Sequence, residues 1–144
     1  MSKITFNGLS GPFLTVYRIL KLWRISVCVH HFHRADEDPD CHDHPFHFMT
    51  IILKGGYWEE TQFNNYPKLV RSKWRGAGYI GFRKASYLHR IVHISDGPCW
   101  TLCIKFTPFI EREWGFQTRE GWVDWRTYLK RKGLTPINKS EDAF

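Results

Sequence analysis

The sequence lacks any apolar stretch long enough to cross a membrane. Its longest nearly apolar run, residues 48–53, is far shorter than the roughly 20 residues that a transmembrane helix needs. The first residues, Met-Ser-Lys-Ile-Thr-Phe-Asn-Gly, contain no apolar segment typical of a secretory signal. We therefore expect a cytoplasmic protein with no membrane partner.

Cysteine is scarce, and its spacing does not point to cross-links. The four cysteines form no Cys-x-x-Cys pair, and a chain without an export signal keeps its thiols reduced. A chain of 144 residues can also bury enough surface to fold without disulfides. We expect free thiols at Cys28, Cys41, Cys99 and Cys103.

Acidic residues are absent from two long segments, 1–35 and 61–95. The second segment carries seven lysines and arginines, and the whole chain has a net charge of +7. A basic middle favours a small anionic partner such as a nucleotide or a phosphate ester, and an ordinary solvated basic surface is the alternative. Binding of nucleic acid has no support from an RNP, helix-turn-helix or zinc-finger pattern.

Short runs of β-branched and aromatic residues recur between glycines and prolines, which predicts an all-β sandwich or barrel. The predicted strands are residues 14–19, 23–33, 48–54, 57–63, 68–74, 79–82, 90–94 and 99–106. Residues 48–53 are apolar on both faces, which predicts a strand covered on both sides. One short helix is predicted near the C-terminus, with Asp124 as its N-cap, residues 125–132 as its body and Gly133 as its stop. We expect one domain, residues 1–134, followed by a polar tail, residues 135–144.

All eight histidines lie in the middle of the chain. His42 and His44 are two residues apart and share one face of a strand, and His89 and His93 do so if their strand is regular. Three converging imidazoles with open positions bind iron(II), zinc, nickel or manganese. We predict His42, His44 and His89 as ligands. His47 and His93 are candidates for a further ligand or for a hydrogen-bonding position beside the ligands.

The histidine spacing resembles that of the cupins. Their first motif, G-x5-H-x-H-x3,4-E-x6-G, is matched at His42, His44 and Gly55. Their second motif, G-x5-P-x-G-x2-H-x3-N, is matched at Gly78 and His89, with His93 at the position of the final asparagine. The resemblance implies a double-stranded β-helix, or jelly-roll barrel, carrying the short C-terminal helix.

The sequence departs from the cupin pattern at the glutamate of the first motif, where it has Phe48, or Met49 under the longer spacing. Without that carboxylate the set resembles the three-histidine site of the thiol dioxygenase branch, whose members bind iron(II) and insert dioxygen into a thiol. The substrate-binding residues of that branch do not carry over. Most of the chain, from Asp36-Glu-Asp-Pro to Gly121-Trp-Val-Asp-Trp, is similar to small cupin-like proteins of bacteria and their phages, which implies a fold and a metal site but no reaction.

Three basic residues are candidates for binding an anionic substrate. Arg83 and Arg90 flank His89, and a guanidinium group pairs bidentately with carboxylate or phosphate. Lys105 shares a polar strand face with Thr101 and two cysteines, and this face lines either a cavity or the solvent. Exposure on the surface is the alternative for all three side chains.

Three functions follow. The first is an iron(II)-dependent oxygenase that acts on a small anionic substrate in the barrel pocket. The second is a non-catalytic cupin that binds or sequesters an anion such as a nucleotide. The third is a zinc- or manganese-dependent hydrolase or isomerase, which needs a carboxylate base such as Asp43 or Glu59. The apolar strand 48–53 is also compatible with a homodimer.

Overall fold

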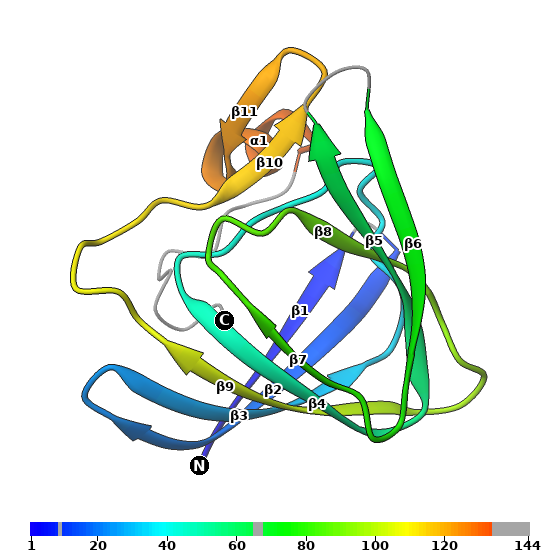
Figure 1. Cartoon of the computed structure of the whole chain (residues 1–144), viewed down its shortest axis with the longest axis vertical. Coiled ribbons are helices and arrows are strands. Elements are labelled where there is room, and N and C mark those ends of the chain that lie inside the picture. The colour runs from blue at the N-terminus through cyan, green and yellow to red at the C-terminus, as the bar shows by residue number, and fades with distance from the viewer. Residues whose placement is uncertain (9, 65–67, 134–144) are drawn as a thin grey trace.

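A computed structural model describes residues 1–8, 10–64 and 68–133. This part of the chain is mostly β-strand with one short helix near its C-terminal end (Figure 1). No helix in it is long and apolar enough to span a membrane. The elements are β1 (Ser2–Gly8), β2 (Gly11–Leu22), β3 (Ile25–Phe32), β4 (His47–Lys54), β5 (Gly56–Asn64), β6 (Leu69–Gly76), β7 (Ile80–Arg83), β8 (His89–Ile94), β9 (Cys99–Phe106), β10 (Gly115–Thr118), β11 (Gly121–Asp124) and α1 (Trp125–Arg131).

Two sheets make the body of the molecule, a jelly-roll barrel. The larger sheet has the order β1-β2-β3-β9-β4-β7, and the smaller has the order β6-β5-β8. The strands paired in these sheets are antiparallel. The β10-β11 hairpin and α1 lie together at one end of the barrel (Figure 1). A cavity lined from both sheets therefore opens towards this hairpin and helix.

The eight predicted strands and the helix are present, with shifted ends. The strand predicted from residue 23 begins at Ile25, because Trp23 has a φ of 49° and belongs to the preceding turn. Asp124 caps α1 as predicted, since its Oδ1 accepts a hydrogen bond from the Thr127 amide at 3.1 Å. The sequence analysis missed β1, β10 and β11, of which the last two are only four residues long. The predicted polar tail, residues 135–144, lies outside the described residues, so the domain limits stay a prediction.

The polarity of β9 is reversed relative to an ordinary barrel strand, whereas β2 and β4 bury apolar residues such as Leu14, Val16 and Ile52. On β9 the polar set faces the interior and is buried: Cys99, Thr101, Cys103 and Lys105. The alternate residues face outwards and are only partly buried: Trp100, Leu102, Ile104 and Phe106. The prediction that residues 48–53 are covered on both sides is wrong for a single copy of the chain, because Leu53 is 53% exposed on the outer face.

The C-terminal hairpin and helix have a small core of their own, and one buried carboxylate makes three of their hydrogen bonds to the barrel. Trp114, Phe116, Trp125 and Tyr128 form that core. Asp43 is buried, and its Oδ1 accepts from the Gly115 amide at 2.8 Å. Its Oδ2 accepts from Arg112 at 2.9 Å and from the Trp122 indole at 3.2 Å. Asp43 thus fixes the segment 41–46 against the hairpin.

Replacing Asp43 is expected to destabilise the fold severely. Asp43→Ala leaves the Arg112 guanidinium, the Gly115 amide and the Trp122 indole without their shared acceptor, and the expected loss of unfolding free energy is about 3 kcal/mol. Urea denaturation monitored by circular dichroism measures it. Glu113→Ala is the matched control, since the Glu113–Arg126 pair is mostly exposed and its loss should cost no more than about 0.5 kcal/mol. Equal effects of the two substitutions would contradict this role.

Candidate metal centre

The structure brings together the three histidines that the sequence analysis selected. One ring nitrogen from each of His42, His44 and His89 lies within 4.8 Å of the others. His42 and His89 form an antiparallel backbone pair, with N–O distances of 2.9 and 3.0 Å. This pairing places both side chains on one face, and His44 follows two residues later on the same face. The predicted convergence is therefore found, and metal binding itself remains a proposal.

Glu59 on β5 orients the imidazole of His89. Its Oε2 lies 2.8 Å from His89 Nδ1, and its Oε1 accepts hydrogen bonds from Arg83 at 3.0 Å and Arg75 at 3.2 Å. Burial opposes ionisation of this carboxyl, but the hydrogen bond and charge of His89, together with Arg83, outweigh it and lower the pKa of Glu59 to about 2. An ionised carboxylate only accepts, so Nδ1 of His89 carries the proton.

The outer ring nitrogen of His89, Nε2, is available as an electron-pair donor, and the other two imidazoles are held in the neutral form. His89 Nε2 is buried and has no hydrogen-bond partner among the described residues, as expected for a nitrogen that faces a metal. Burial lowers the pKa of His42 and His44 well below the ordinary value, and neighbouring histidines lower it further. Both imidazoles are therefore neutral at pH 7, which is the form that binds metal. The donor set fits a divalent ion such as iron(II), zinc, nickel or manganese.

Phe48 occupies the side of this cluster where the cupin pattern has a glutamate. Its ring centroid lies 4.8 Å from that of His44 and 5.9 Å from that of His89. The side chain is buried, and it places an apolar edge against the three imidazoles. The cluster therefore offers three nitrogen donors with no carboxylate from position 48.

His47 and His93 lie away from the cluster. His47 Nδ1 accepts a hydrogen bond from the Ala85 amide at 2.9 Å, and His47 is not part of the group that could hold a metal. His93 is exposed. The β5–β8 pairing shifts register between Trp58 and Glu59, so that one extra residue, Val92, lies opposite this step. A bulge of this kind turns His93 out of the face that His89 occupies.

The basic residues predicted to bind an anion have other surroundings. Arg83 pairs with Glu59, and Arg90 pairs with Glu60 at 2.6 Å and donates to the Asp38 carbonyl. Lys105 is 2% exposed, with its Nζ 5.0 Å from the centroid of the Phe46 ring. None of the three lines the barrel cavity. Binding of an anion by these residues stays a prediction.

The three histidines lie on the wall of a cavity of about 260 Å³ inside the barrel. Nine of its 25 lining residues are phenylalanine, tyrosine or tryptophan, among them Phe6, Phe13, Phe32, Phe46, Trp114 and Phe116. His30, on β3, also lines the cavity, and its Nε2 is buried without a hydrogen-bond partner among the described residues. A small ligand can therefore contact the histidines and an aromatic wall together.

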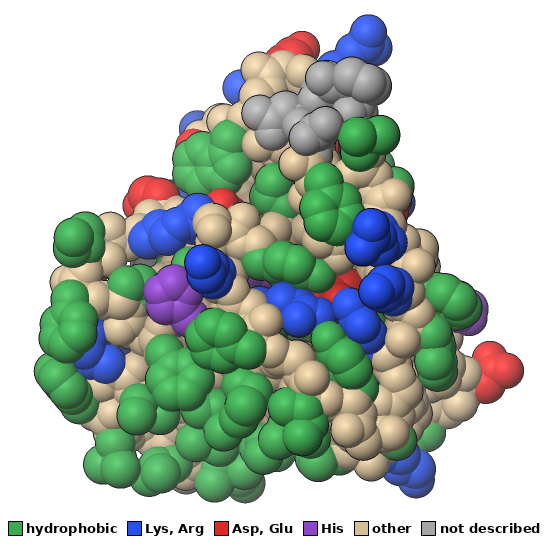
Figure 2. All heavy atoms as spheres, viewed as in Figure 1, with side chains coloured by type: hydrophobic (Ala, Val, Ile, Leu, Met, Phe, Trp, Pro, Cys, Tyr) green, Lys and Arg blue, Asp and Glu red, His purple; other side chains and the backbone are tan. Residues whose placement is uncertain are grey.

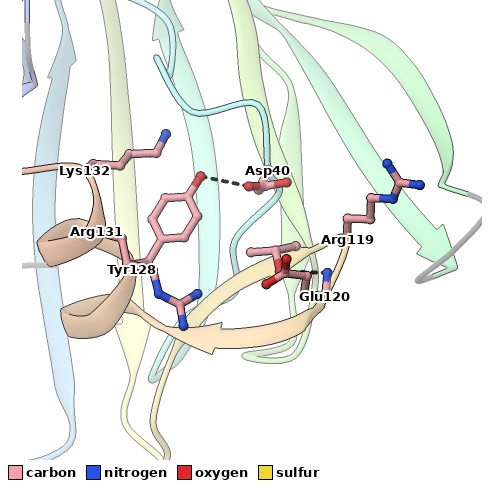
Figure 3. A pocket seen from close by; sticks show the side chains of 7 residues that line it. Asp40, Arg119, Glu120, Tyr128, Arg131 and Lys132 are labelled. Atoms are coloured by element: carbon pink, nitrogen blue, oxygen red, sulfur yellow. Dashed lines mark hydrogen bonds between the residues drawn. The ribbon is translucent and has the colours of Figure 1, made fainter.

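A second hollow, of about 320 Å³, lies between the β10-β11 turn and α1. Figure 3 shows Tyr128 pointing at Asp40, whose Oδ2 accepts its hydroxyl at 2.9 Å, while Arg119 points away from them. Arg119, Glu120 and Arg131 are exposed. Acidic and basic side chains alternate here and the aspartate has its partner, so this hollow is an ordinary feature of the surface.

No protein-family model matches the chain, and no curated protein is similar to it in sequence. Solved structures resemble it in fold. Iron(II) HppE aligns with a TM-score of 0.59 at 9% identity, over 73% of this chain and 56% of that one. A putative mannose-6-phosphate isomerase from Ralstonia eutropha gives 0.58 at 13% identity, over 71% and 92% of the two chains. The polyketide cyclase RemF from Streptomyces resistomycificus gives 0.53 at 15% identity, over 66% of each.

The fold is that of the cupins. The chain spans little more than half the length of HppE, and at these identities the likeness carries the architecture alone. It agrees with the jelly-roll barrel that the histidine motifs implied.

Some residues of the site were missed from the sequence. Glu59 was considered only as a base, although it holds His89, and its place opposite the histidine depends on the β5–β8 pairing. His30 carries no motif signal at all. The aromatic wall has a weak signal in composition, since 17% of the chain is aromatic, but its members come from seven separate segments.

Removing the charge of Glu59 is expected to weaken metal binding more than it weakens the fold. Glu59→Gln keeps the shape but loses the carboxylate that fixes the proton on His89 Nδ1, so affinity for cobalt(II) or zinc should fall 10- to 100-fold. Competition with a chelating dye measures it. Glu60→Gln is the matched control, because Glu60 lies on the opposite face of β5 and pairs with Arg90. Unchanged affinity in Glu59→Gln would contradict the assignment.

Proposed function

We propose that the protein is a metal-dependent enzyme of the oxygenase type, with iron(II) held by His42, His44 and His89. The observation that carries the proposal is the set of three converging imidazole donors, with burial keeping His42 and His44 neutral, on the wall of a mainly apolar cavity that has Phe48 in place of a carboxylate. Three protein ligands leave coordination positions open for small molecules. An iron(II) enzyme, HppE, is among the structures that share the fold.

Bound iron(II) would supply chemistry with dioxygen, and zinc or manganese in the same place would supply Lewis acidity. The chain itself performs three tasks. Glu59 keeps the proton on His89 Nδ1 and directs Nε2 into the site. Burial keeps His42 and His44 neutral. The aromatic wall excludes water and so strengthens every polar interaction within the cavity.

A metal-dependent isomerase or hydrolase is the second candidate, and one carboxyl favours it. Asp36 lines the cavity, and burial raises its pKa to about 6, near the value useful for a general base. The carboxylates named from the sequence are less suitable, because both oxygens of Asp43 and both of Glu59 accept hydrogen bonds within the protein.

Sequestration of an anion has less support, since Arg83 and Arg90 already pair with glutamates.

Elemental analysis of protein purified without a metal-binding tag tests the proposal. We expect about one iron per chain after reconstitution with iron(II), and its loss in the double variant His42→Ala/His89→Ala. The double variant His47→Ala/His93→Ala is the matched control and should keep its iron. Negligible iron in the folded wild type would contradict the oxygenase proposal, and preferential binding of zinc or manganese would favour the second candidate.

A further inference from the structure

Away from the three histidines, the described side chains of the cavity wall offer no free positive charge to an anionic ligand. Its charged lining residues are Asp36, Glu37, Asp38 and Lys132, which is three acids against one base. Lys132 Nζ pairs with Asp38, so the single cation is already neutralised. Because a charge that leaves water needs an opposite partner, a carboxylate or phosphate in this space would find one only in the metal ion that the three histidines are proposed to hold, and none among the described side chains of the wall.

The same wall suits a flat and uncharged molecule. Aromatic side chains face the cavity from both sheets and from the C-terminal extension, for example Phe32, Tyr57 and Trp114. Aromatic rings gain from burial against other rings in edge-to-face and offset arrangements. A volume of about 260 Å³ is at the small end for ligand cavities, which limits the occupant to one or two rings.

Two polar groups on β3 and β9 give this space a hydrogen-bonding spot. His30 and Thr101 are direct partners in the β3–β9 register, and both line the cavity. The buried Nε2 of His30 has no hydrogen-bond partner among the described residues. Leaving a buried nitrogen unsatisfied costs free energy unless a ligand supplies the hydrogen bond. A hydroxyl or carbonyl group on the ligand would satisfy it.

We infer that the cavity binds an uncharged one- or two-ring aromatic molecule that carries a hydroxyl or carbonyl group. The inference rests on the proposed function, since it names the substrate class of the same site. It replaces the small anion expected from the sequence, because the arginines on which that expectation depended lie outside the cavity.

Calorimetric titration with two matched probes tests this. 2-Naphthalenemethanol is uncharged, and 2-naphthalenesulfonate carries an anion on the same rings. We expect the alcohol to bind at least tenfold more tightly. Leu14→Phe, which fills the cavity from β2, should weaken its binding at least tenfold, and the control Leu20→Phe, on the exposed side of β2, should not. His30→Ala should weaken the alcohol about fivefold and leave naphthalene unchanged.

Equal or tighter binding of the sulfonate would overturn the inference, as would equal affinities in the two leucine variants. Metal content is measured on the same samples. Iron bound without binding of the alcohol overturns the ligand class while the metal proposal stands. Binding of the alcohol to protein that takes up no iron supports the ligand class and contradicts the metal proposal.

The outer face of the large sheet carries an independent inference. Figure 2 shows apolar side chains gathered in the lower part of the view, over this sheet. Two continuous rows cross five strands in register: Tyr17, Val29, Leu102, Ile51 and Ile80 form one row, and Leu20, Val27, Ile104, Met49 and Phe82 form the other. Neither row contains a charged residue. Ile80 and Phe82 are 62% and 60% exposed.

We propose that this face binds a second copy of the chain. Four strands of at least eight residues and β7 of four residues, about 4.8 Å apart, give a footprint of roughly 600 Å², and two copies bury about twice that, which is at the lower end of the size of a stable dimer. The two apolar rows carry no charge and can complement themselves across a two-fold axis. Pairing through these rows also keeps charged side chains out of the contact, although each chain has a net charge of +7.

Light scattering coupled to gel filtration tests the pairing. The wild type should have twice the chain mass of 17.2 kDa at micromolar concentration, and Phe82→Lys should have the mass of one chain with unchanged stability. The matched control is Phe63→Lys, because Phe63 is 59% exposed on β5 and lies off this face; it should remain dimeric. A monomeric wild type at 100 µM, or a Phe82→Lys dimer, would overturn the proposal. Co-sedimentation of a monomeric wild type with phosphatidylcholine vesicles would assign the face to lipid instead.

Discussion

The site depends on two backbone hydrogen bonds between His42 and His89. They attach the segment before β4 to the first residue of β8, although 46 residues separate the two histidines in the chain. Because the segment is extended, alternate side chains point in opposite directions. His42 and His44 turn into the barrel, while Asp43 turns out to the Gly115 amide and Arg112. One short stretch thus supplies the candidate ligands and anchors the C-terminal hairpin.

The charge of the buried carboxylate of Glu59 is balanced within the protein. Glu59 is 3% exposed, a position in which a lone carboxylate would be strongly unfavourable. Arg83, Arg75 and His89 surround it, and these contacts outweigh the cost of burial. The arginines are therefore committed to the carboxylate that orients a ligand. Arg75 and Arg83, from the basic middle of the sequence, thus hold Glu59 from outside the cavity. Lys132 is the one lysine or arginine among the described residues that line the cavity.

Features that depend on the spacing of residues along the chain were predicted correctly. Features that depend on which strands lie next to each other were not. The strand periods, the Asp124 cap and the convergence of His42 and His44 with His89 follow from local geometry and motif order. Periodicity also showed which residues of 99–106 share a face, but it does not say which face is inside. The place of His93 depends on a bulge opposite Trp58, and the partner of Arg83 lies on another strand. Neither leaves a trace in the linear sequence.

The polar lining of the cavity and the apolar outer face of the large sheet both result from which side chains the strands turn inwards. Strands that turn Thr50, Thr101 and Cys103 inwards line a hollow that can hold a ligand, and they necessarily turn their branched and aromatic residues outwards. A hollow interior buries less apolar surface, and in the described residues the buried core divides into small separate clusters. Part of the apolar area that such a barrel does not bury inside lies in the two rows of the outer face. Covering that face with a second copy would supply stabilisation that a filled core normally provides, at roughly 25 cal/mol per Å² of apolar surface. The proposed uncharged ligand inside the barrel and the proposed second copy outside it therefore follow from the same arrangement, in which β9, and β4 at Thr50, turn polar residues inwards and apolar residues outwards.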